Sequence, residues 1–356
     1  MPHLLVDISS HGFGHVGQTA PVVNELARRI PELHVTLRTA APRFLLQQNF
    51  HCDFRHLPVA FDFGMQMASA VDVQVKESAA AYRAFHAGWE EKVGREAHAM
   101  RVLEPDLLLA NVPYLSLAAA HVAGVRAVGM CSLNWADIYR HYCFGDTASR
   151  TIHAQMLAAY NGAECFLKVQ PAMPMPGLFN ARNINPIART GCNQRTSIAA
   201  KIRLGEAEKL VLVSMGGMEF RLPVERWPHL PGVRWIIPQA WQVQRDDMVS
   251  LESLGLPFGD VLASCDAVLT KPGYGTFAEA ACDGVPVLYV ARRDWPEEPY
   301  LVQWLSKHGV CLEVQRDALH SGNLGDALNQ LWALPRPAAP VPSGINEAAD
   351  YLTALL

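Results

Sequence analysis

The sequence carries little charge, and it has no long apolar run. Only 18% of its 356 residues are Asp, Glu, Lys or Arg, against about 25% in an ordinary soluble domain. The formal net charge of −4 shows no basic excess of the kind that nucleic acid or an anionic membrane attracts. No apolar run reaches the roughly 20 residues that a membrane span needs. We therefore expect no nucleic-acid partner and no transmembrane segment.

The eight cysteines include no Cys-x-x-Cys pair, which argues against a structural zinc site. Scattered thiols in a chain of this length are typical of a reducing compartment. The first residues show neither a basic region nor a cleavage signal for secretion. These features predict a cytoplasmic protein without a metal centre. The length favours two domains.

Short apolar segments alternate with helix-like segments along the whole chain. In the first half we expect strands at 4–8, 35–39, 107–110 and 125–130, and helices at 16–30, 42–49 and 116–123. In the second half we expect strands at 209–214, 233–237, 267–270 and 285–290, and helices at 258–264, 276–282 and 346–356. This alternation of near-continuously apolar strands with helices predicts parallel sheets that are covered on both faces.

The pattern breaks at residues 171–177, which hold three prolines and a glycine, and residues 180–191 are also irregular. We expect the domain linker in this region. Both halves open with an apolar strand followed by a glycine-rich turn. Two doubly wound domains would bind ligands at the carboxyl ends of their strands, in a cleft between the domains.

The first motif is Ser-Ser-His-Gly-Phe-Gly-His at residues 9–15, directly after the first strand. Gly12 and Gly14 allow the backbone to approach a ligand, and the following helix offers free N–H groups. The spacing does not match the Gly-x-Gly-x-x-Gly dinucleotide fingerprint. His11 and His15 flank the turn, where a histidine that faces a cleft can act as a general base. The alternative is that His15 only caps or packs the helix start.

Two further glycine turns lie in the second half. Gly216 and Gly217 close the strand at 209–214, where their amides either bind phosphate or simply form a turn. The segment 270–280 ends a strand, contains Gly273 and Gly275, and then begins a helix at Thr276. The N-terminus of that helix suits a diphosphate.

Two charged side chains in the segment 270–280 each allow two interpretations. Glu279 lies three residues after Thr276, which is capping-box spacing, but its carboxylate could instead accept two ribose hydroxyls. Lys271 either compensates phosphate charge or is a solvated surface lysine. Both questions concern the same turn.

The segment 292–299, Arg-Arg-Asp-Trp-Pro-Glu-Glu-Pro, follows the next strand and therefore lies at the same edge of the sheet. Its carboxylates could accept hydrogen bonds from sugar hydroxyls, while Trp295 could pack on a pyranose face. The alternative is an exposed charged loop with internal ion pairs.

These motifs resemble those of GT-B glycosyltransferases, notably the MurG-like and UDP-glycosyltransferase groups. They most resemble the glycosyltransferase-like domain of plant arabinokinase-type proteins. The resemblance is carried by His-Gly-Phe-Gly-His at 11–15 and Lys-Pro-Gly-Tyr-Gly-Thr-Phe-Ala-Glu at 271–279, and it extends over 284–289 and 293–299. It implies an α/β GT-B fold of two Rossmann-like, doubly wound parallel-sheet domains. We expect an N-terminal acceptor domain at 1–188, a donor domain at 189–340, and a helix at 341–356 that crosses back to the first domain.

The resemblance also implies roles for individual residues. Glu279 would take the donor ribose, Phe258 would pack on the base, and His15 would be the general base. Many relatives orient this histidine with an aspartate, whereas Asn111 stands in the corresponding position here, and Asp7 or Asp137 are alternative partners. The implied catalytic residues are His15, His11 and Asn111, and the implied acceptor-binding residues are Gly12, Phe13 and Gly14. The implied donor-binding residues are Gly216, Gly217, Phe258, Lys271, Gly273, Tyr274, Gly275, Thr276, Glu279, Asp294, Glu297 and Glu298.

The sequence thus predicts sugar transfer, with inversion, from a nucleotide-diphosphate sugar to a small acceptor. A UDP-sugar or dTDP-sugar is favoured as the co-substrate. No cofactor is expected, and no metal is expected because there is no Asp-x-Asp motif. The alternatives are a nucleotide-sugar hydrolase or epimerase, or a non-catalytic nucleotide-sugar-binding protein. Surface apolar residues near 61–67 could hold the acceptor or contact a membrane.

Overall fold

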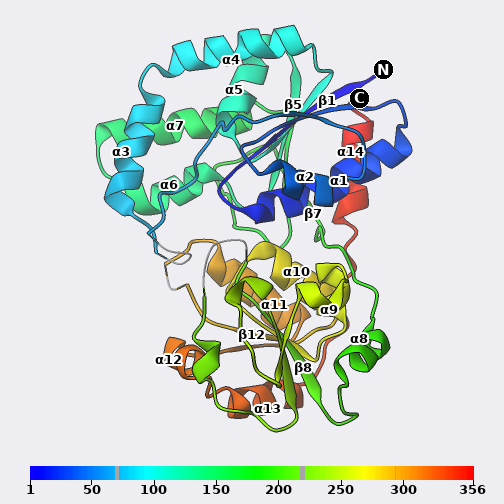
Figure 1. Ribbon diagram of the computed structural model, residues 1–356. Coiled ribbons are helices and arrows are strands. Elements are labelled where there is room, and N and C mark those ends of the chain that lie inside the picture. The colour runs from blue at the N-terminus through cyan, green and yellow to red at the C-terminus, as the bar shows by residue number, and fades with distance from the viewer. Residues whose placement is uncertain (69–71, 217–220, 293) are drawn as a thin grey trace. The chain divides into compact units, whose positions relative to one another are not determined.

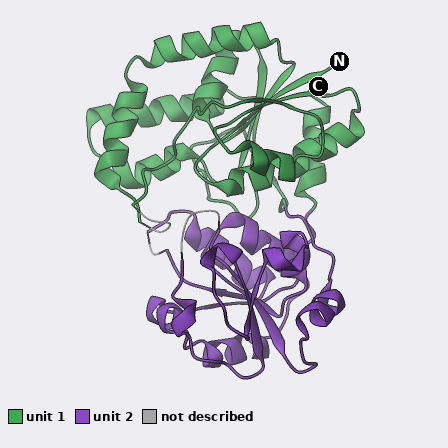
Figure 2. Cartoon of the chain, in the orientation of Figure 1, with its two compact units in different colours: residues 1–187, 343–356 green, residues 188–342 purple. Residues whose placement is uncertain are grey.

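The chain forms two compact units, which Figure 2 shows in separate colours. The computed structural model describes residues 1–68, 72–216, 221–292 and 294–356. Unit 1 comprises residues 1–187 together with 343–356, and unit 2 comprises residues 188–342. The chain therefore passes between the units twice. Gly217, one of the expected donor-binding residues, lies outside the described residues.

Unit 1 is built on a seven-stranded parallel sheet with the order β3-β2-β1-β4-β5-β6-β7. Helices cover both faces of this sheet, with α1, α2 and α14 on one side and α4, α5 and α7 on the other (Figure 1). The strands are β1 His3–Ile8, β2 His34–Arg38, β3 Arg55–Leu57, β4 Leu107–Asn111, β5 Arg126–Cys131, β6 Cys165–Val169 and β7 Ala181–Ile184. The helices are α1 Phe13–Arg29, α2 Arg43–Asn49, α3 Val75–His86, α4 Trp89–Leu103, α5 Tyr114–Ala123, α6 Trp135–Cys143, α7 Thr147–Asn161 and α14 Gly344–Thr353.

Unit 2 repeats this plan with a six-stranded parallel sheet of order β10-β9-β8-β11-β12-β13. Its core gathers the apolar side chains of these strands around Trp227 and Trp235. The strands are β8 Lys209–Ser214, β9 Val233–Ile237, β10 Met248–Ser250, β11 Ala267–Thr270, β12 Val287–Tyr289 and β13 Cys311–Glu313. The helices are α8 Arg195–Ile202, α9 Phe258–Ala263, α10 Tyr274–Cys282, α11 Glu298–His308, α12 Arg316–Ser321 and α13 Gly325–Ala333, with short 3-10 turns at Val224–Arg226, Gln239–Trp241 and Glu252–Leu254.

The strand order reverses at one point in each sheet, between β1 and β4 in unit 1 and between β8 and β11 in unit 2. In unit 1 the parallel register pairs Ile8 with Asn111 at the carboxyl ends. In unit 2 it pairs Ser214 with Thr270. The helices that follow the two strands at such a reversal cross to opposite faces of the sheet. The crevice between them is where α/β proteins bind ligands. Each unit therefore carries its expected motifs at such a reversal.

The predicted fold class is confirmed, because the eight predicted strands all form and agree with the structure within two residues at each end. The strands are almost completely buried, which explains why they appear in the sequence as continuous apolar runs. In β4, for example, every residue is buried. The predicted linker is wrong in part. The segment 180–191 contains β7, the exposed edge strand of the first sheet, and unit 1 continues to Ile187.

Helix α14 belongs to unit 1 although it follows unit 2 in sequence. It packs against α1, and Figure 1 shows the two helices, red and blue, side by side. Arg29 of α1 forms an ion pair with Asp350 and donates to Asn346 Oδ1 over 3.0 Å. The amide of Asn185 also donates to Glu347 Oε1 at 2.8 Å. These contacts attach the final helix to the first sheet.

A buried ion triad ties β1 and β2 to α4. The Arg38 guanidinium donates to both oxygens of Asp7 at 2.6 Å and to Glu96 at 2.5 Å. Arg38 is only 3% exposed and Asp7 is fully buried. Burial raises the pKa of Glu96, although Arg38 lowers it. Removing the cation would leave the buried Asp7 and the partly buried Glu96 without a counter-charge.

We therefore expect Arg38→Met to lower the free energy of unfolding by about 3–5 kcal/mol, the usual cost of breaking a buried ion pair. Urea denaturation at neutral pH measures this loss. The matched control is Arg28→Met, which removes an arginine with a 71% exposed side chain from its pair with Glu25 and should change stability by less than about 1 kcal/mol. Equal effects of the two variants would contradict the prediction.

Candidate functional site

A histidine and an asparagine meet at the strand reversal of unit 1. His15 lies in the first turn of α1, and its Nδ1 is 2.8 Å from Oδ1 of Asn111, the last residue of β4. Both side chains are buried. Burial lowers the pKa of His15, and the bond to Asn111 only partly opposes this effect. The ring is therefore neutral at pH 7 and can accept a proton.

Asn111 is itself held by a second buried amide. Its Nδ2 donates to Gln18 Oε1 at 3.2 Å, and Gln18 Nε2 donates to Ser132 Oγ at 3.0 Å. Gln18 was not expected from the sequence, although it follows His15 by three residues and so lies on the same face of α1. With the Asn111 amide in this orientation, Oδ1 can only accept, so His15 Nδ1 would carry the proton and the lone pair would be on Nε2.

The alternative partners of His15 are engaged elsewhere. Asp7 binds Arg38 with both carboxylate oxygens. The Asp137 carboxylate accepts from Nδ2 of Asn134, the residue that caps α6, at 3.0 Å. Of the three candidates, the structure brings only Asn111 into hydrogen-bond contact with His15.

His11 belongs to a tightly packed group around a buried carboxylate. The His11 ring lies edge-on to Trp135, with the ring centres 5.0 Å apart, and the same indole is 5.9 Å from the His15 ring. Trp135 Nε1 donates to Asp62 Oδ2 at 2.7 Å, and Ser9 Oγ donates to Asp62 Oδ1 at 2.8 Å. Burial raises the pKa of Asp62 to about 6. No sequence signal marks Asp62 or Trp135, because the fold brings them together from distant segments.

The backbone around the first glycine motif is open. A Cβ atom at Gly12 or Gly14 would meet no atom within 4 Å. Helix α1 starts at Phe13, which is 43% exposed, and no side chain caps the N–H groups of its first turn. These amides are therefore available to a polar ligand group.

The sequence predicts surface apolar residues near 61–67, and this expectation is wrong for Phe61 and Met65, whereas Phe63 and Met67 are half-buried. Phe61 and Met65 are buried, and the Arg38 guanidinium lies 4.2 Å from the centre of the Phe61 ring. Gly64 adopts a positive φ of 62°, and a Cβ there would lie 2.5 Å from His11 Cγ. The segment thus forms the packing under His11.

In unit 2, the turns after β8 and β11 place a cation against a glycine. Gly216 has a φ of +79°, and a Cβ there would lie 3.6 Å from Lys271 Nζ. Burial and the nearby charge of Arg292 together lower the pKa of Lys271 to about 8, and Glu297 partly opposes the shift. Lys271 is therefore not a solvated surface lysine. An anion bound beside it would favour its charged form.

Helix α10 begins two residues earlier than predicted. It starts at Tyr274 after Gly273, and no side chain caps it. Thr276 is therefore inside the first turn, and the capping-box interpretation of Glu279 is wrong. A Cβ at Gly275 would meet no atom within 4 Å, so the start of the helix is open.

Glu279 lies further along α10, where the residue as a whole is half-buried. Burial raises the pKa of Glu279 to about 7, although the positive charge of Arg189 lowers it. Phe258, the expected base-packing residue, is the half-buried first residue of α9.

The charged segment 292–299 is more internally bonded than a free sugar-binding loop would be. Both Glu298 oxygens accept from the backbone N–H of Arg292, at 3.1 and 2.8 Å. Trp295 is buried beneath the Arg292 guanidinium, 4.6 Å from the ring centre, and donates to Glu297 Oε2 at 3.2 Å. Trp295 therefore does not present an open face for a sugar. Asp294 is the exposed carboxylate of the segment.

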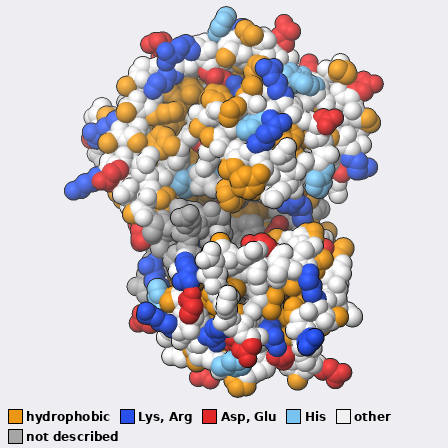
Figure 3. Space-filling view, viewed as in Figure 1, with side chains coloured by type: hydrophobic (Ala, Val, Ile, Leu, Met, Phe, Trp, Pro, Cys, Tyr) orange, Lys and Arg blue, Asp and Glu red, His pale blue; other side chains and the backbone are white. Residues whose placement is uncertain are grey.

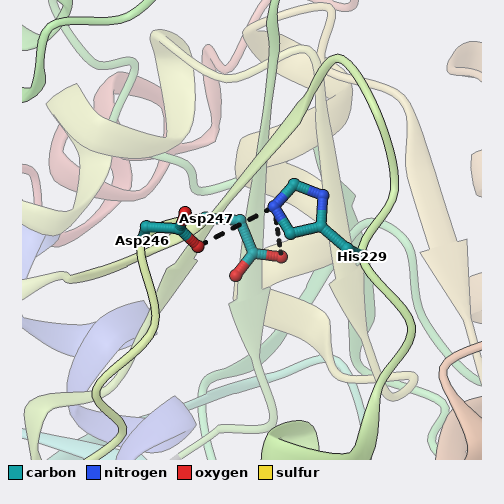
Figure 4. Close-up of side chains that lie close together, drawn as sticks. All are labelled: His229, Asp246 and Asp247. Atoms are coloured by element: carbon teal, nitrogen blue, oxygen red, sulfur yellow. Dashed lines mark ion pairs between the residues drawn. The ribbon is translucent and has the colours of Figure 1, made fainter.

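A separate cluster of His229, Asp246 and Asp247 lies at the opposite edge of the second sheet, before β9 and β10 (Figure 4). His229 Nε2 is 3.8 Å from Asp246 and 4.0 Å from Asp247. Both oxygens of Asp247 already accept from Arg245, at 2.9 and 2.7 Å. We interpret the group as a structural polar cluster around the ion pair of Arg245 with the buried Asp247.

The visible surface mixes charges of both signs over each unit (Figure 3). Within the described ranges, no helix is both long and apolar enough to span a membrane.

No protein-family model matches the chain. L-arabinokinase from Arabidopsis thaliana is 24% identical over 342 residues, a match that covers 88% of this chain and 30% of that protein. The chain thus spans less than a third of the length of this curated relative.

Solved structures resemble the whole chain. The glycosyltransferase of kitacinnamycin has 17% identity and a TM-score of 0.66, with 100% of both chains covered. The calicheamicin glycosyltransferase CalG4 has 17% identity and a TM-score of 0.63, with coverage of 100% of this chain and 95% of that one. UGT89C1 from Arabidopsis thaliana, in complex with UDP, has 15% identity and a TM-score of 0.61, with 99% of both chains covered. The fold is therefore the two-unit α/β GT-B fold of these glycosyltransferases.

The buried carboxyl of Asp62 makes stability depend on pH. Because its pKa is about 6 in the folded protein and about 3.9 in an unfolded chain, the folded state holds this proton more tightly between these values. The free energy of unfolding therefore falls as pH rises through that window. Relative to Asp62→Asn, the wild-type protein should lose roughly 2–3 kcal/mol between about pH 4 and pH 7.

Urea denaturation of both proteins across that pH range measures the difference. Asn can still accept from Trp135, so the variant keeps the packing. Asp326→Asn, at an exposed carboxylate of α13, is the control and should track the wild type. A constant difference between Asp62→Asn and wild type at every pH would show that Asp62 does not titrate in this window.

Proposed function

We propose that the protein is a glycosyltransferase that moves a sugar from a nucleotide-diphosphate sugar to an acceptor hydroxyl. One observation carries the proposal: a buried histidine lies at the strand reversal of unit 1, and an open helix start with a lysine in the preceding turn lies at the reversal of unit 2. The chain also has the fold of known glycosyltransferases, one of which, UGT89C1, is described in complex with UDP-L-rhamnose and with quercetin.

Unit 2 would bind the donor. The amides at Gly216 and at the start of α10 would receive the diphosphate, and the Lys271 ammonium would neutralise it. Glu279 would bind the ribose, and Phe258 would pack on the base. Gly273, Tyr274, Gly275 and Thr276 would form the turn around the phosphates. Asp294 would face the sugar, and Glu297 and Glu298 would hold its loop through their bonds to Trp295 and Arg292. We favour UDP or dTDP as the nucleotide and propose that no divalent metal is needed.

Unit 1 would bind the acceptor at Gly12, Phe13 and Gly14 and would activate it at His15. The acceptor oxygen attacks the anomeric carbon while the bond from that carbon to the phosphate oxygen breaks. The acceptor proton moves to His15 Nε2, and the nucleoside diphosphate leaves with the bonding electron pair. Attack from the opposite face inverts the anomeric centre. The amides at the start of α10 stabilise the departing charge.

A second candidate is a nucleotide-sugar-binding protein without catalysis. Asn111 supports this reading, because a neutral amide orients the histidine but does not stabilise the imidazolium by charge. A nucleotide-sugar hydrolase or epimerase would share the donor site and would differ at the acceptor side.

His15→Ala should abolish sugar transfer, with a loss of about 100-fold or more, and should leave the Kd for UDP unchanged. Transfer from a panel of UDP-sugars and dTDP-sugars to phenolic and sugar acceptors is measured by release of the nucleoside diphosphate. His121→Ala, at an exposed histidine in the last turn of α5, is the matched control. Unchanged turnover in His15→Ala would exclude the general base. Wild-type protein that binds a donor without turnover would support the binding-protein alternative.

Gly275→Val should abolish stabilisation by UDP, because the new side chain would occupy the open space over the first turn of α10. UDP at 100 times its Kd should stabilise the wild-type protein by about 2.7 kcal/mol, read as a rise in Tm. Gly145→Val is the matched control, since a Cβ at Gly145 also meets no atom within 4 Å. The donor-site assignment fails if neither UDP, dTDP nor GDP shifts the Tm of the wild-type protein.

A further inference from the structure

A continuous chain of uncharged, buried side chains leads away from the proposed general base. From His15 it runs to Asn111 at 2.8 Å, on to Gln18 at 3.2 Å, and reaches Ser132 at 3.0 Å. All four side chains are at most 8% exposed. They come from α1, the end of β4 and the residue after β5, so two adjacent strands and one helix fix the chain. Such a network is costly to bury unless every member is satisfied.

The position of Gln18 bears directly on which proton His15 holds. A terminal amide can turn either its oxygen or its nitrogen toward a neighbour. If Asn111 turned its nitrogen toward His15, Nδ1 would have to be the acceptor and Nε2 would carry the proton. The imidazole could then no longer remove a proton through Nε2. A carboxylate in place of Asn111 would need no such control, because both its oxygens accept.

We propose that Gln18, anchored by Ser132, is a positioning residue that holds the Asn111 amide with its oxygen toward His15 and thereby sets the base-competent tautomer. This inference rests on the proposed function, since it assigns Gln18 a task in that reaction. Gln18 presents Oε1 to Asn111 Nδ2 and directs its own Nε2 to Ser132 Oγ. The neutral chain takes over the orienting task that an aspartate performs in a charged pair.

Other side chains around His15 also affect its pKa, and a substitution of Gln18 leaves them unchanged. Cys131 Sγ lies 3.8 Å from Nδ1. The Trp135 ring packs against His15 from α6 and joins it to Asp62 and His11. A variant at Gln18 leaves all of these side chains in place, so changes in the tautomer or in the pH profile report on the amide chain.

The test compares Gln18→Met, which keeps the size but removes both hydrogen-bonding atoms, with Gln18→Glu, which keeps an acceptor toward Asn111. We expect Gln18→Met to lower kcat about 10- to 100-fold, a part of the roughly 10⁴-fold loss that a wrong tautomer causes, with KM for the donor unchanged. Gln18→Glu should recover most of kcat. Its added negative charge should also move the acidic limb of the pH–kcat profile to higher pH. Gln48→Met, at an exposed glutamine of α2, is the matched control.

A spectroscopic readout separates this inference from the proposed function. In protein labelled with ¹⁵N-histidine, the His15 signals are assigned by their absence in His15→Ala. They should show a protonated Nδ1 and an unprotonated Nε2 in the wild type, and a mixture of tautomers in Gln18→Met. This readout needs no substrate, so it tests the amide chain even if no sugar transfer is found.

An unchanged tautomer in Gln18→Met, or a kcat within about twofold of wild type, would overturn the inference. A wild-type ring with the proton on Nε2 would overturn it as well. If Gln18→Met does not fold, Ser132→Ala removes only the far end of the chain, and the same tautomer and kcat changes are expected from it in weaker form. Unchanged values in folded Ser132→Ala would then count against the inference.

Discussion

The parallel pairing of β1 with β4 is the constraint on which the first site depends. Its register brings Ile8 beside Asn111, and the helix that follows β1 then turns His15 back onto the end of β4. A shift of one residue would point Asn111 to the opposite face of the sheet. The same arrangement in unit 2, where Ser214 pairs with Thr270, brings Gly216 and Lys271 together. The same parallel pairing of two strands at the reversal thus positions two chemically different sites, one in each unit.

Burial shifts the ionisable groups of both sites toward their uncharged forms. It lowers the pKa of His15, lowers that of Lys271 to about 8, and raises that of Glu279 to about 7. Lys271 and Glu279 are therefore close to a change of charge near neutral pH, and a charged ligand would decide which form persists. Because these groups are shifted toward their uncharged forms, a charged ligand at either site would meet few fixed charges that compete for it. This electrostatic pattern is typical of sites that bind or react rather than of structural ion pairs such as Asp7 with Arg38.

The sequence predicted eight of the strands but not β3, β6, β7, β10 or β13, and it predicted the site in part. Strands such as β4 and β8 are buried on both faces, so they appear in the sequence as continuous apolar runs that can be recognised. Helix α4 was missed because its buried residues Trp89, Val93, Ala97 and Met100 are spread among charges, although they recur at helical spacing. The glycine motifs could be recognised because closely spaced glycines after a strand indicate a local turn. Asp62, Trp135 and Ser132 were not, because only tertiary packing brings them to the two histidines.

The return of α14 to unit 1 makes the first unit discontinuous in sequence. Residues 188–342 are made between the two parts of unit 1, so the face of α1 that carries Arg29 stays uncovered until unit 2 has been synthesised. Domains generally fold as units while the chain is being made. Unit 2 is continuous and can complete its core first, whereas unit 1 gains its final packing contact afterwards. Although most of unit 1 is made before unit 2, unit 1 therefore completes its packing after unit 2.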